Sequence, residues 1–229
     1  MKTIQEIFKF CSEKFLKSRY VNETAKKAIL SIIHCRTEKM KRRLKSCDDC
    51  GYEEYSYCSC RNRNCPICLT YAKEKWIESR VSEILNTRYF HIVFTVPHKL
   101  NDVIYNNQIE MYNILFHSVS ETLADLGRDT KHLGAQVGAT MVLHTWDQKL
   151  LPHNHVHTII PGGGLSFDGK WVNCKKKIFI HVKVLAEVFR GKFIAKMKAS
   201  YNTGKLVFPK ELEYLYNKGN FEDLGEIKK

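Results

Sequence analysis

Two closely spaced pairs of cysteines constrain the fold of this chain more than any other feature of its sequence. Cys47 and Cys50 form one Cys-x-x-Cys pair, and Cys65 and Cys68 form another after an interval of fourteen residues. Two such pairs can hold one Zn²⁺ in a tetrahedral set of four thiolates. The segment 35–68 around them lacks hydrophobic periodicity, so a metal would stabilise it in place of a core. We predict a structural zinc ion bound by these four residues.

Other donors in the same segment leave the choice of ligands open. Cys35, Cys58 and Cys60 accompany the two pairs, and His34 precedes Cys35. They could be free thiols, members of a different set of four, or ligands of a second zinc ion. We favour a single site, because a second one would need four more donors at good geometry.

The charge of the chain indicates what it binds. Among 229 residues the formal net charge is +13, and the pI is about 9.3. Such an excess favours polyanions, and nucleic acid first, although a solvated lysine-rich face would give the same count. We expect DNA phosphates to meet the basic residues around the cysteines, which are Arg61, Arg63, Lys73 and Lys75.

The sequence also suggests where the protein resides. No run of about 18 apolar residues is present, so no membrane span is expected, and the N-terminus MKTIQEIFKF does not resemble a secretory signal. We therefore expect a cytoplasmic protein, in a prokaryotic cytosol or nucleoid. In that reducing compartment, nine cysteines are better interpreted as metal ligands than as disulfides.

A second concentration of metal-binding side chains lies near residue 155. On a strand, His155 and His157 point to the same face about 7 Å apart, and His153 shares their parity if the strand extends that far. They could be partly buried histidines with hydrogen-bond partners, but the alternation favours a divalent metal ion. A third ligand is expected, with His144 as the first candidate and Gln148 as the second.

Hydrophobic periodicity predicts an α+β protein: an N-terminal helical zinc-binding module followed by an antiparallel-sheet domain with packed helices. The predicted domains are residues 1–86, residues 87–209 and a polar tail, 210–229. Helices are expected near 4–15, 22–33, 70–86, 101–126 and 183–201, and strands near 90–96, 138–146, 155–160 and 170–172.

Four blocks of sequence resemble one protein family. They are SCRNRNCPIC (59–68), HIVFTVPHKL (91–100), VLHTWDQKLLPHNHVHTIIPGGGLSFDGKW (142–171) and VFRGKF (188–193). In this order they resemble the HUH-class rolling-circle insertion-sequence transposases, in the branch with an N-terminal transposase zinc-binding domain. The resemblance extends from about residue 20 to residue 209.

The resemblance implies roles for particular residues. Cys47, Cys50, Cys65 and Cys68 would bind zinc, and Cys35 and Cys60 stand where the family tends to have cysteine. His155-Val156-His157 would be the HUH triplet that binds Mg²⁺ or Mn²⁺ in an HUH endonuclease-like domain, supported by the strand motif of residues 94–97. The family nicks one DNA strand through a tyrosine, which leaves a 5′-phosphotyrosine and a free 3′-OH. The partner implied is DNA at transposon ends, single-stranded or hairpin.

The same resemblance raises a question about the nucleophile. In the family the catalytic tyrosine lies well beyond the FRGKF helix, in a segment that this chain does not reach. The late tyrosines Tyr201, Tyr214 and Tyr216 are better explained by packing or solvent exposure. We therefore expect a C-terminally truncated transposase whose nucleophilic tyrosine is missing.

Three other functions remain open. The chain could be a non-catalytic DNA-binding protein, such as a transposase relic or a regulator that occupies transposon ends. A plasmid-type replication initiator would use the same HUH chemistry, but the cysteine module and the PGGGLS continuation favour the transposase. A metal-dependent hydrolase would need a general base, for which Asp147 is the nearby carboxylate.

Overall fold

The computed structural model describes residues 3–18, 20–175 and 177–208, and the chain divides into two compact units. Unit 1 is Met1–Ile84 and unit 2 is Leu85–Lys229. Helices and antiparallel strands are both present, so the fold is α+β as predicted. None of the described helices is long and apolar enough to span a membrane. The predicted tail, 210–229, lies outside the described residues.

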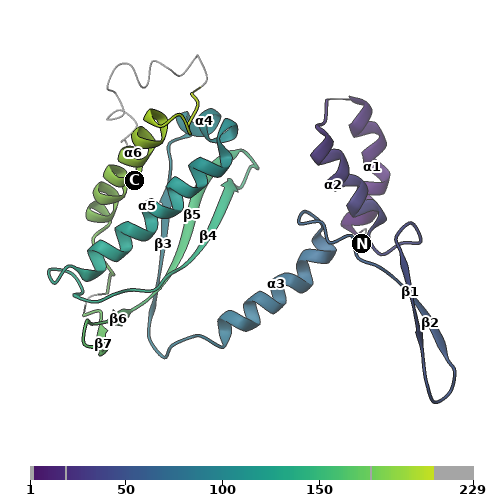
Figure 1. The fold of residues 1–229 in the computed structure, drawn as a ribbon, viewed down its shortest axis with the longest axis horizontal. Coiled ribbons are helices and arrows are strands. Elements are labelled where there is room, and N and C mark those ends of the chain that lie inside the picture. The colour runs from purple at the N-terminus through teal and green to yellow at the C-terminus, as the bar shows by residue number, and fades with distance from the viewer. Residues whose placement is uncertain (1–2, 19, 176, 209–229) are drawn as a thin grey trace. The chain divides into compact units, whose positions relative to one another are not determined.

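Unit 1 contains three helices and one two-stranded ribbon (Figure 1). Helix α2 begins where its sequence predicts, because the Asn22 side chain accepts a hydrogen bond of 2.8 Å from the Ala25 N–H. The amide of Gln5 on α1 donates to three carbonyls at the C-terminal end of α2 and so joins the two helices. The elements of this unit are α1 (Ile4–Ser18), α2 (Glu23–His34), β1 (Arg42–Ser46), β2 (Glu53–Tyr57) and α3 (Pro66–Val81).

The segment 35–68, in which the sequence shows no hydrophobic periodicity, contains two strands and the start of α3. β1 and β2 pair as an antiparallel ribbon from Arg42 opposite Tyr57 to Ser46 opposite Glu53. Helix α3 begins at Pro66 rather than near residue 70, because proline is well suited to the first turn of a helix, and it ends at Val81 rather than at 86. The sequence does not indicate these two strands, because the ribbon is exposed along nearly its whole length. Its residues therefore show no alternation of apolar and polar side chains.

Unit 2 is built on a three-stranded antiparallel sheet in the order β3-β5-β4. β5 lies in the centre, with His155 opposite Thr95 of β3 and opposite His144 of β4. The sheet strands are β3 (Tyr89–Thr95), β4 (Thr140–Trp146) and β5 (Pro152–Pro161); the other elements are η1 (His98–Leu100), α4 (Asn101–Asn106), α5 (Gln108–Arg128), β6 (Gly163–Leu165), β7 (Trp171–Asn173) and α6 (Val182–Asn202).

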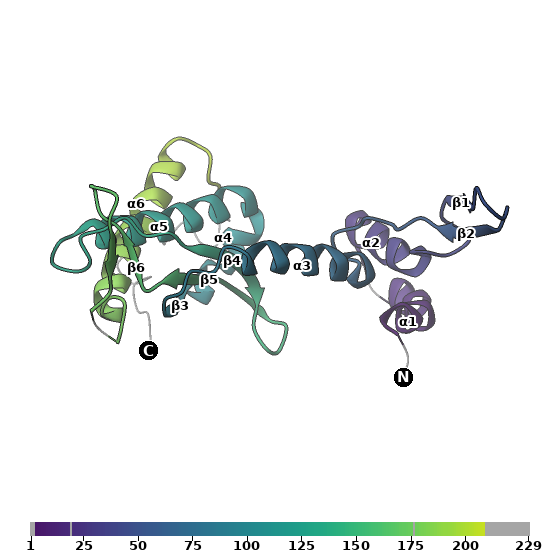
Figure 2. The ribbon, with the colours of Figure 1, turned by 90° about the horizontal axis from the view of Figure 1, so that it is seen from below.

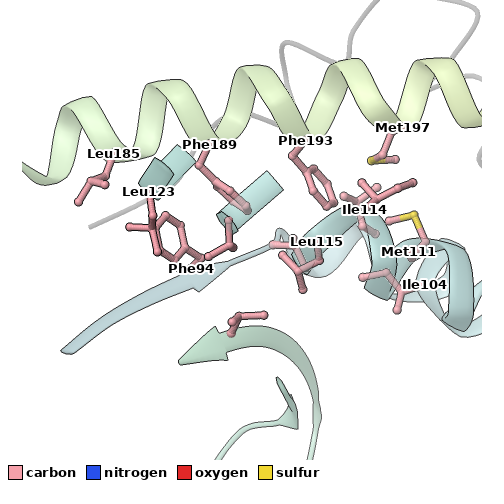
Figure 3. Packing of buried hydrophobic residues seen from close by; sticks show 14 of the residues in the cluster. Phe94, Ile104, Met111, Ile114, Leu115, Leu123, Leu185, Phe189, Phe193 and Met197 are labelled. Carbon is pink, nitrogen blue, oxygen red and sulfur yellow. The ribbon is translucent and has the colours of Figure 1, made fainter. Parts of the chain in front are cut away.

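Helices α5 and α6 cover one face of this sheet (Figures 1 and 2). Phe94 of β3 packs against Phe189 of α6, with ring centroids 5.1 Å apart, while Val156 and Ile160 of β5 are fully buried beneath the helices. Figure 3 shows the α6 side chains Leu185, Phe189, Phe193 and Met197 facing the α5 residues of the same core. The hydrophobic free energy of unit 2 is therefore concentrated on this side of the sheet.

The long helix predicted over 101–126 is divided at Asn107. The Asn107 backbone, with φ −134°, ends α4 and precedes α5, and its side chain donates to the carbonyls of Val103 and Val207. An asparagine side chain that bonds to neighbouring backbone competes with helical hydrogen bonds. The hydrophobic periodicity of the sequence continues across Asn107, because α4 and α5 both bury apolar residues in the same core.

The three glycines after β5 are required by close backbone contacts. A Cβ atom on Gly164 would lie 2.4 Å from the Gln136 carbonyl oxygen, and one on Gly163 would lie 2.5 Å from that of Val172. Glycine at these positions lets β6 pair with β7 and also bridge to Gln136.

Candidate metal centres

Four cysteines of unit 1 converge at one point. Cys35 ends α2, Cys60 lies in the following loop, and Cys65 and Cys68 begin α3. Their sulfur atoms all lie within 4.8 Å of one another, and the Cys68 sulfur is 3.5 Å from that of Cys35 and 3.7 Å from that of Cys60. Tetrahedral zinc with Zn–S bonds of about 2.3 Å would separate sulfurs by ~3.8 Å. The four thiols therefore fit a closed zinc site.

The surroundings of this group suit a structural metal. Cys35 and Cys65 are buried together with Ile32, and Phe8 and Ile67 pack against them as the small core of unit 1. Because the core has so few members, the ion would join α2 to α3 more strongly than side-chain packing does. Among the described residues, this group supplies the four thiols that a structural zinc ion takes.

Without a metal, the thiols of Cys35, Cys60 and Cys68 differ in the direction of their pKa shifts. Burial raises the pKa of Cys35 and raises that of Cys60 to about 12. Burial also raises the pKa of Cys68, but hydrogen bonds from the Cys35 thiol, the Arg61 backbone and the Cys60 thiol outweigh it and lower that pKa. Cys68 lies in the first turn of α3, where the helix dipole also favours a thiolate.

The structure separates the four cysteines that the sequence predicts as one site. Cys65 and Cys68 join Cys35 and Cys60, while Cys47 and Cys50 lie in the turn that connects β1 to β2. The ribbon carries this first pair to its tip, away from the ends of α2 and α3. Among the described residues the thiols that converge are therefore those of Cys35, Cys60, Cys65 and Cys68, and Cys47, Cys50 and Cys58 lie outside this group.

Three histidines converge on the sheet of unit 2. His144 of β4 and His155 and His157 of β5 have ring nitrogens that all lie within 4.8 Å of one another. They occupy the face of the sheet opposite the helices, because they alternate with the buried residues Val156 and Thr158. The structure thus brings His144 to the predicted pair. Gln148 lies exposed in the β4–β5 turn, outside this group.

Hydrogen bonds orient two of these rings. His155 Nδ1 lies 2.8 Å from the His153 carbonyl oxygen, so it donates its proton there and leaves Nε2 free to bind a metal. His157 Nδ1 lies 2.7 Å from His91 Nε2 on β3. When His157 Nδ1–H donates to His91, the His157 Nε2 atom is likewise a ligand.

The start of β5 is fixed by the segment after β3. The Asn101 side chain donates to the Pro152 carbonyl at 2.9 Å, and the Val96 N–H donates to the Asn154 carbonyl at 3.2 Å. These bonds extend β5 back to Pro152, three residues before the predicted start, and set the register that places His155 opposite His144.

The surroundings of His157 and His153 favour their neutral forms. Burial and the charges that His144, His155 and His91 would carry lower the pKa of His157. Burial, His155 and His98 similarly lower the pKa of His153, and Asp147 opposes them weakly. A neutral imidazole is the form that binds metals, so these shifts favour ligation over protonation.

Two family models match this chain. Residues 7–96 match the transposase zinc-binding domain, and residues 138–226 match a putative transposase family. The putative transposase y4qJ of Sinorhizobium fredii (strain NBRC 101917 / NGR234) is 38% identical over 220 residues, 95% of this chain and 55% of that protein. The chain belongs to the transposases that carry a transposase zinc-binding domain.

Two further likenesses complete the comparison. The transposase for insertion sequence element IS801 of Pseudomonas savastanoi pv. phaseolicola is 26% identical over 165 residues, 71% of this chain and 39% of that protein. The conjugative relaxase TrwC in complex with oriT DNA gives a TM-score of 0.39 at 16% identity, over 48% of this chain and 42% of the relaxase. The transposase chain described here spans about half the length of the curated relatives it matches.

The other predicted residues of this transposase are dispersed. Tyr201 lies on α6, where its ring packs edge-to-face on Phe208 at 5.3 Å, and α6 covers the face of the sheet opposite the histidines. Tyr214 and Tyr216 lie outside the described residues. The Asp147 carboxylate accepts hydrogen bonds from the N–H groups of Lys149 and Leu151 within its own turn, which leaves little reason to assign it the role of a base.

The basic residues predicted to meet DNA are all exposed. Arg61, at φ +52°, forms the loop between two ligating cysteines, while Lys73 and Lys75 lie on α3. Two positions apart on a helix, these lysines point in different directions, so they do not form one face. Arg63 lies between Cys60 and Cys65 on the same loop as Arg61.

Sequence reasoning missed His91 of the transposase site, and it placed His153 only by its parity with His155 and His157. His91 contacts His157 directly, and His153 stacks near His155 with ring centroids 4.8 Å apart. Among the described residues, His153 Nδ1 is buried without a hydrogen-bond partner. His91 could have been identified only from the register of β3 on β5, since 66 residues separate it from His157.

Proposed function

We propose that unit 2 provides the metal site for nicking single-stranded DNA at transposon ends by metal-assisted transesterification to a tyrosine, a nucleophile that the three described site residues do not themselves supply. The supporting observation is the set of three imidazoles, His144, His155 and His157, on the sheet face opposite α5 and α6. A divalent ion held by three neutral histidines keeps coordination positions open, and a phosphate oxygen can occupy one of them. A closed four-thiol site offers no such position.

The donor set also bears on the choice of metal. Imidazole nitrogen suits transition-metal ions, whereas Mg²⁺ prefers oxygen ligands. We therefore propose Mn²⁺ as the better of the two ions first considered. When bound, the ion would polarise a phosphate oxygen and stabilise the charge that develops on it. The residues of the chain orient the ligands: the His153 carbonyl fixes His155, and His91 fixes His157.

The proposed reaction conserves the phosphodiester bond energy. The tyrosine oxygen forms a bond to phosphorus, the bond from phosphorus to the 3′ oxygen breaks, and the 3′ oxygen receives the proton that the tyrosine loses. The products are a 5′-phosphotyrosine and a free 3′-OH, which can later reverse the reaction on another strand. No nucleotide cofactor is needed.

The sheet face around the histidines is suited to unpaired bases. Trp146 is 54% exposed and lies parallel to His144 with ring centroids 6.1 Å apart, and Val93, Val142 and Ile159 are exposed on the same face. Bases of a single strand can stack on aromatic rings and pack on such apolar side chains. The zinc module would add phosphate contacts through exposed residues such as Arg61 and Arg63.

The experiment combines metal binding with detection of a covalent product. The chain is incubated with Mn²⁺ and a single-stranded oligonucleotide that carries a transposon end, and the products are separated under denaturing conditions. We expect Mn²⁺ binding by calorimetry that is lost in His155→Ala. A protein–DNA adduct would show that a tyrosine of this chain is the nucleophile, against the prediction that it is missing, and the adduct should also be lost in His155→Ala. His132→Ala, which changes an exposed histidine outside the group, serves as the matched control.

Two results would count against the proposal. An adduct that survives in His155→Ala would remove the metal from the reaction. Mn²⁺ and DNA binding by the intact chain without any adduct would favour the alternative, a non-catalytic protein that occupies transposon ends.

A further inference from the structure

The tip of the β1–β2 ribbon carries two thiols that the four-cysteine group does not use. Cys47 directly follows β1, Cys50 lies three residues later, and both are exposed. The turn between them is closed by two backbone hydrogen bonds, from the Gly51 N–H to the Cys47 carbonyl at 2.9 Å and from the Cys47 N–H to the Tyr52 carbonyl at 2.8 Å. Gly51 has φ +69°, a conformation that glycine adopts without strain.

The tight turn holds Cys50 near Cys47, because its two backbone hydrogen bonds close within the segment 47–52. The backbone of Cys50 and Asp49 and the Cys50 thiol lower the pKa of Cys47. Backbone N–H groups directed at a sulfur stabilise negative charge on it. The turn therefore resembles one half of a tetrahedral thiolate site, prepared by the backbone before any metal arrives.

The other half of the site is not supplied by the described part of this chain. The described groups of at least three donors are the four-cysteine group and the three histidines, and neither includes Cys47 or Cys50. Every β1 residue is exposed, so no neighbouring element brings further donors to the ribbon. A zinc ion at the tip would keep two positions for ligands from elsewhere.

A second copy of the ribbon fits those two positions. Two-fold symmetry would present the same pair of thiols from the partner, which makes four. The tips carry Asp48 and Asp49, so two metal-free tips repel each other and a divalent cation is needed between them. Leu44 and Tyr55 lie directly opposite each other on β1 and β2 and are 48% and 54% exposed, apolar area that a second ribbon would cover.

We propose that Cys47 and Cys50 form half of a second zinc site, completed by the same two cysteines of a second copy. The four thiols release four protons to solvent as one Zn²⁺ binds, so no redox step is involved. The shared ion joins two zinc modules tip to tip. This inference concerns unit 1 alone and does not require the nicking activity proposed for unit 2.

The test measures zinc content and molecular mass together. The full chain is prepared in reducing buffer with zinc, and metal analysis is combined with sedimentation equilibrium. We expect about 1.5 zinc ions per chain in a dimer, and about 1.0 per chain in a monomeric Cys47→Ser/Cys50→Ser variant. The control Cys11→Ser/Cys58→Ser changes two cysteines outside both sites and should behave as the unchanged chain.

Several results would overturn the inference. These are a monomer of the unchanged chain, about two zinc ions per monomer, or a dimer that the double variant preserves. A dimer that separates on stronger reduction but not on zinc chelation would show a disulfide in place of zinc. Amide hydrogen exchange on α1–α3 of the double variant would verify that the four-cysteine site still folds.

Discussion

The cysteine group and the histidine group show two different relations between a metal site and a hydrophobic core. The four thiols replace a core: they lie between α2 and α3, with few apolar neighbours, and two of them are fully buried. The three imidazoles rest on a core: the other face of their sheet packs against α5 and α6, and His144 and His157 are only partly buried. Removing the metal should therefore unfold one unit and leave the other folded but inactive.

The largest expected effect is the loss of zinc from unit 1. Cys65→Ser removes a fully buried ligand, and structural zinc contributes an apparent free energy of about 10–16 kcal/mol to folding. We expect rapid amide hydrogen exchange throughout α1–α3, with the protection of unit 2 unchanged, as measured by mass spectrometry. Cys58→Ser is the matched control. If Cys65→Ser left α2 and α3 protected, the apolar contacts would be sufficient without a metal.

A smaller but selective effect is expected in unit 2. His155→Ala should weaken Mn²⁺ binding by more than about 100-fold, a loss larger than removal of an orienting partner would cause. The thermal unfolding of unit 2 should change little, because the core on the other face is intact. Calorimetric titration measures the first and near-ultraviolet circular dichroism the second. If His155→Ala lost metal binding and folding together, the fold of unit 2 would depend on its metal in the way predicted for the cysteine group of unit 1.

His91 should have an intermediate effect as a positioning residue. His91→Ala removes the acceptor that fixes the His157 tautomer, so Mn²⁺ affinity should fall by about 10-fold. His91→Asn, whose side-chain oxygen can accept the same hydrogen bond, should recover part of this loss. The measurement is again a calorimetric titration. If alanine and asparagine behaved alike, the contact would have no orienting role.

The smallest effect concerns the pH dependence of the metal-free protein. The pKa values of His153 and His157 are lowered in the folded protein. As the pH falls through about 6.5, these histidines therefore become protonated in the unfolded chain while they are still neutral in the folded one. The free energy of unfolding of unit 2 should be constant above that pH and should fall as the pH is lowered through it. Urea titrations across this range measure the slope. The slope should flatten in His153→Asn/His157→Asn, and an unchanged slope would assign it to other groups.

Sequence patterns predicted the elements of unit 2 better than the connections of unit 1. The alternation of Phe90, Ile92 and Phe94 predicted β3, and that of His155 and His157 predicted their shared face, because one buried face imposes a period of two. The β1–β2 ribbon buries neither face, so it had no such signal. The break at Asn107 was also hidden, since the apolar period continues across it.

The sequence by itself determined which side chains could bind metals and, through the alternation of β5, which histidines share a face. It also determined the family, because four motifs in order carry that information. The tertiary structure decided which donors meet. Cys35 joins Cys65 across thirty residues, and His91 meets His157 across 66, because helix ends and strand register bring them together. The spacing of residues in the sequence predicts contacts within one turn or one strand. Contacts between residues that are far apart in the sequence depend on how the helices and strands pack.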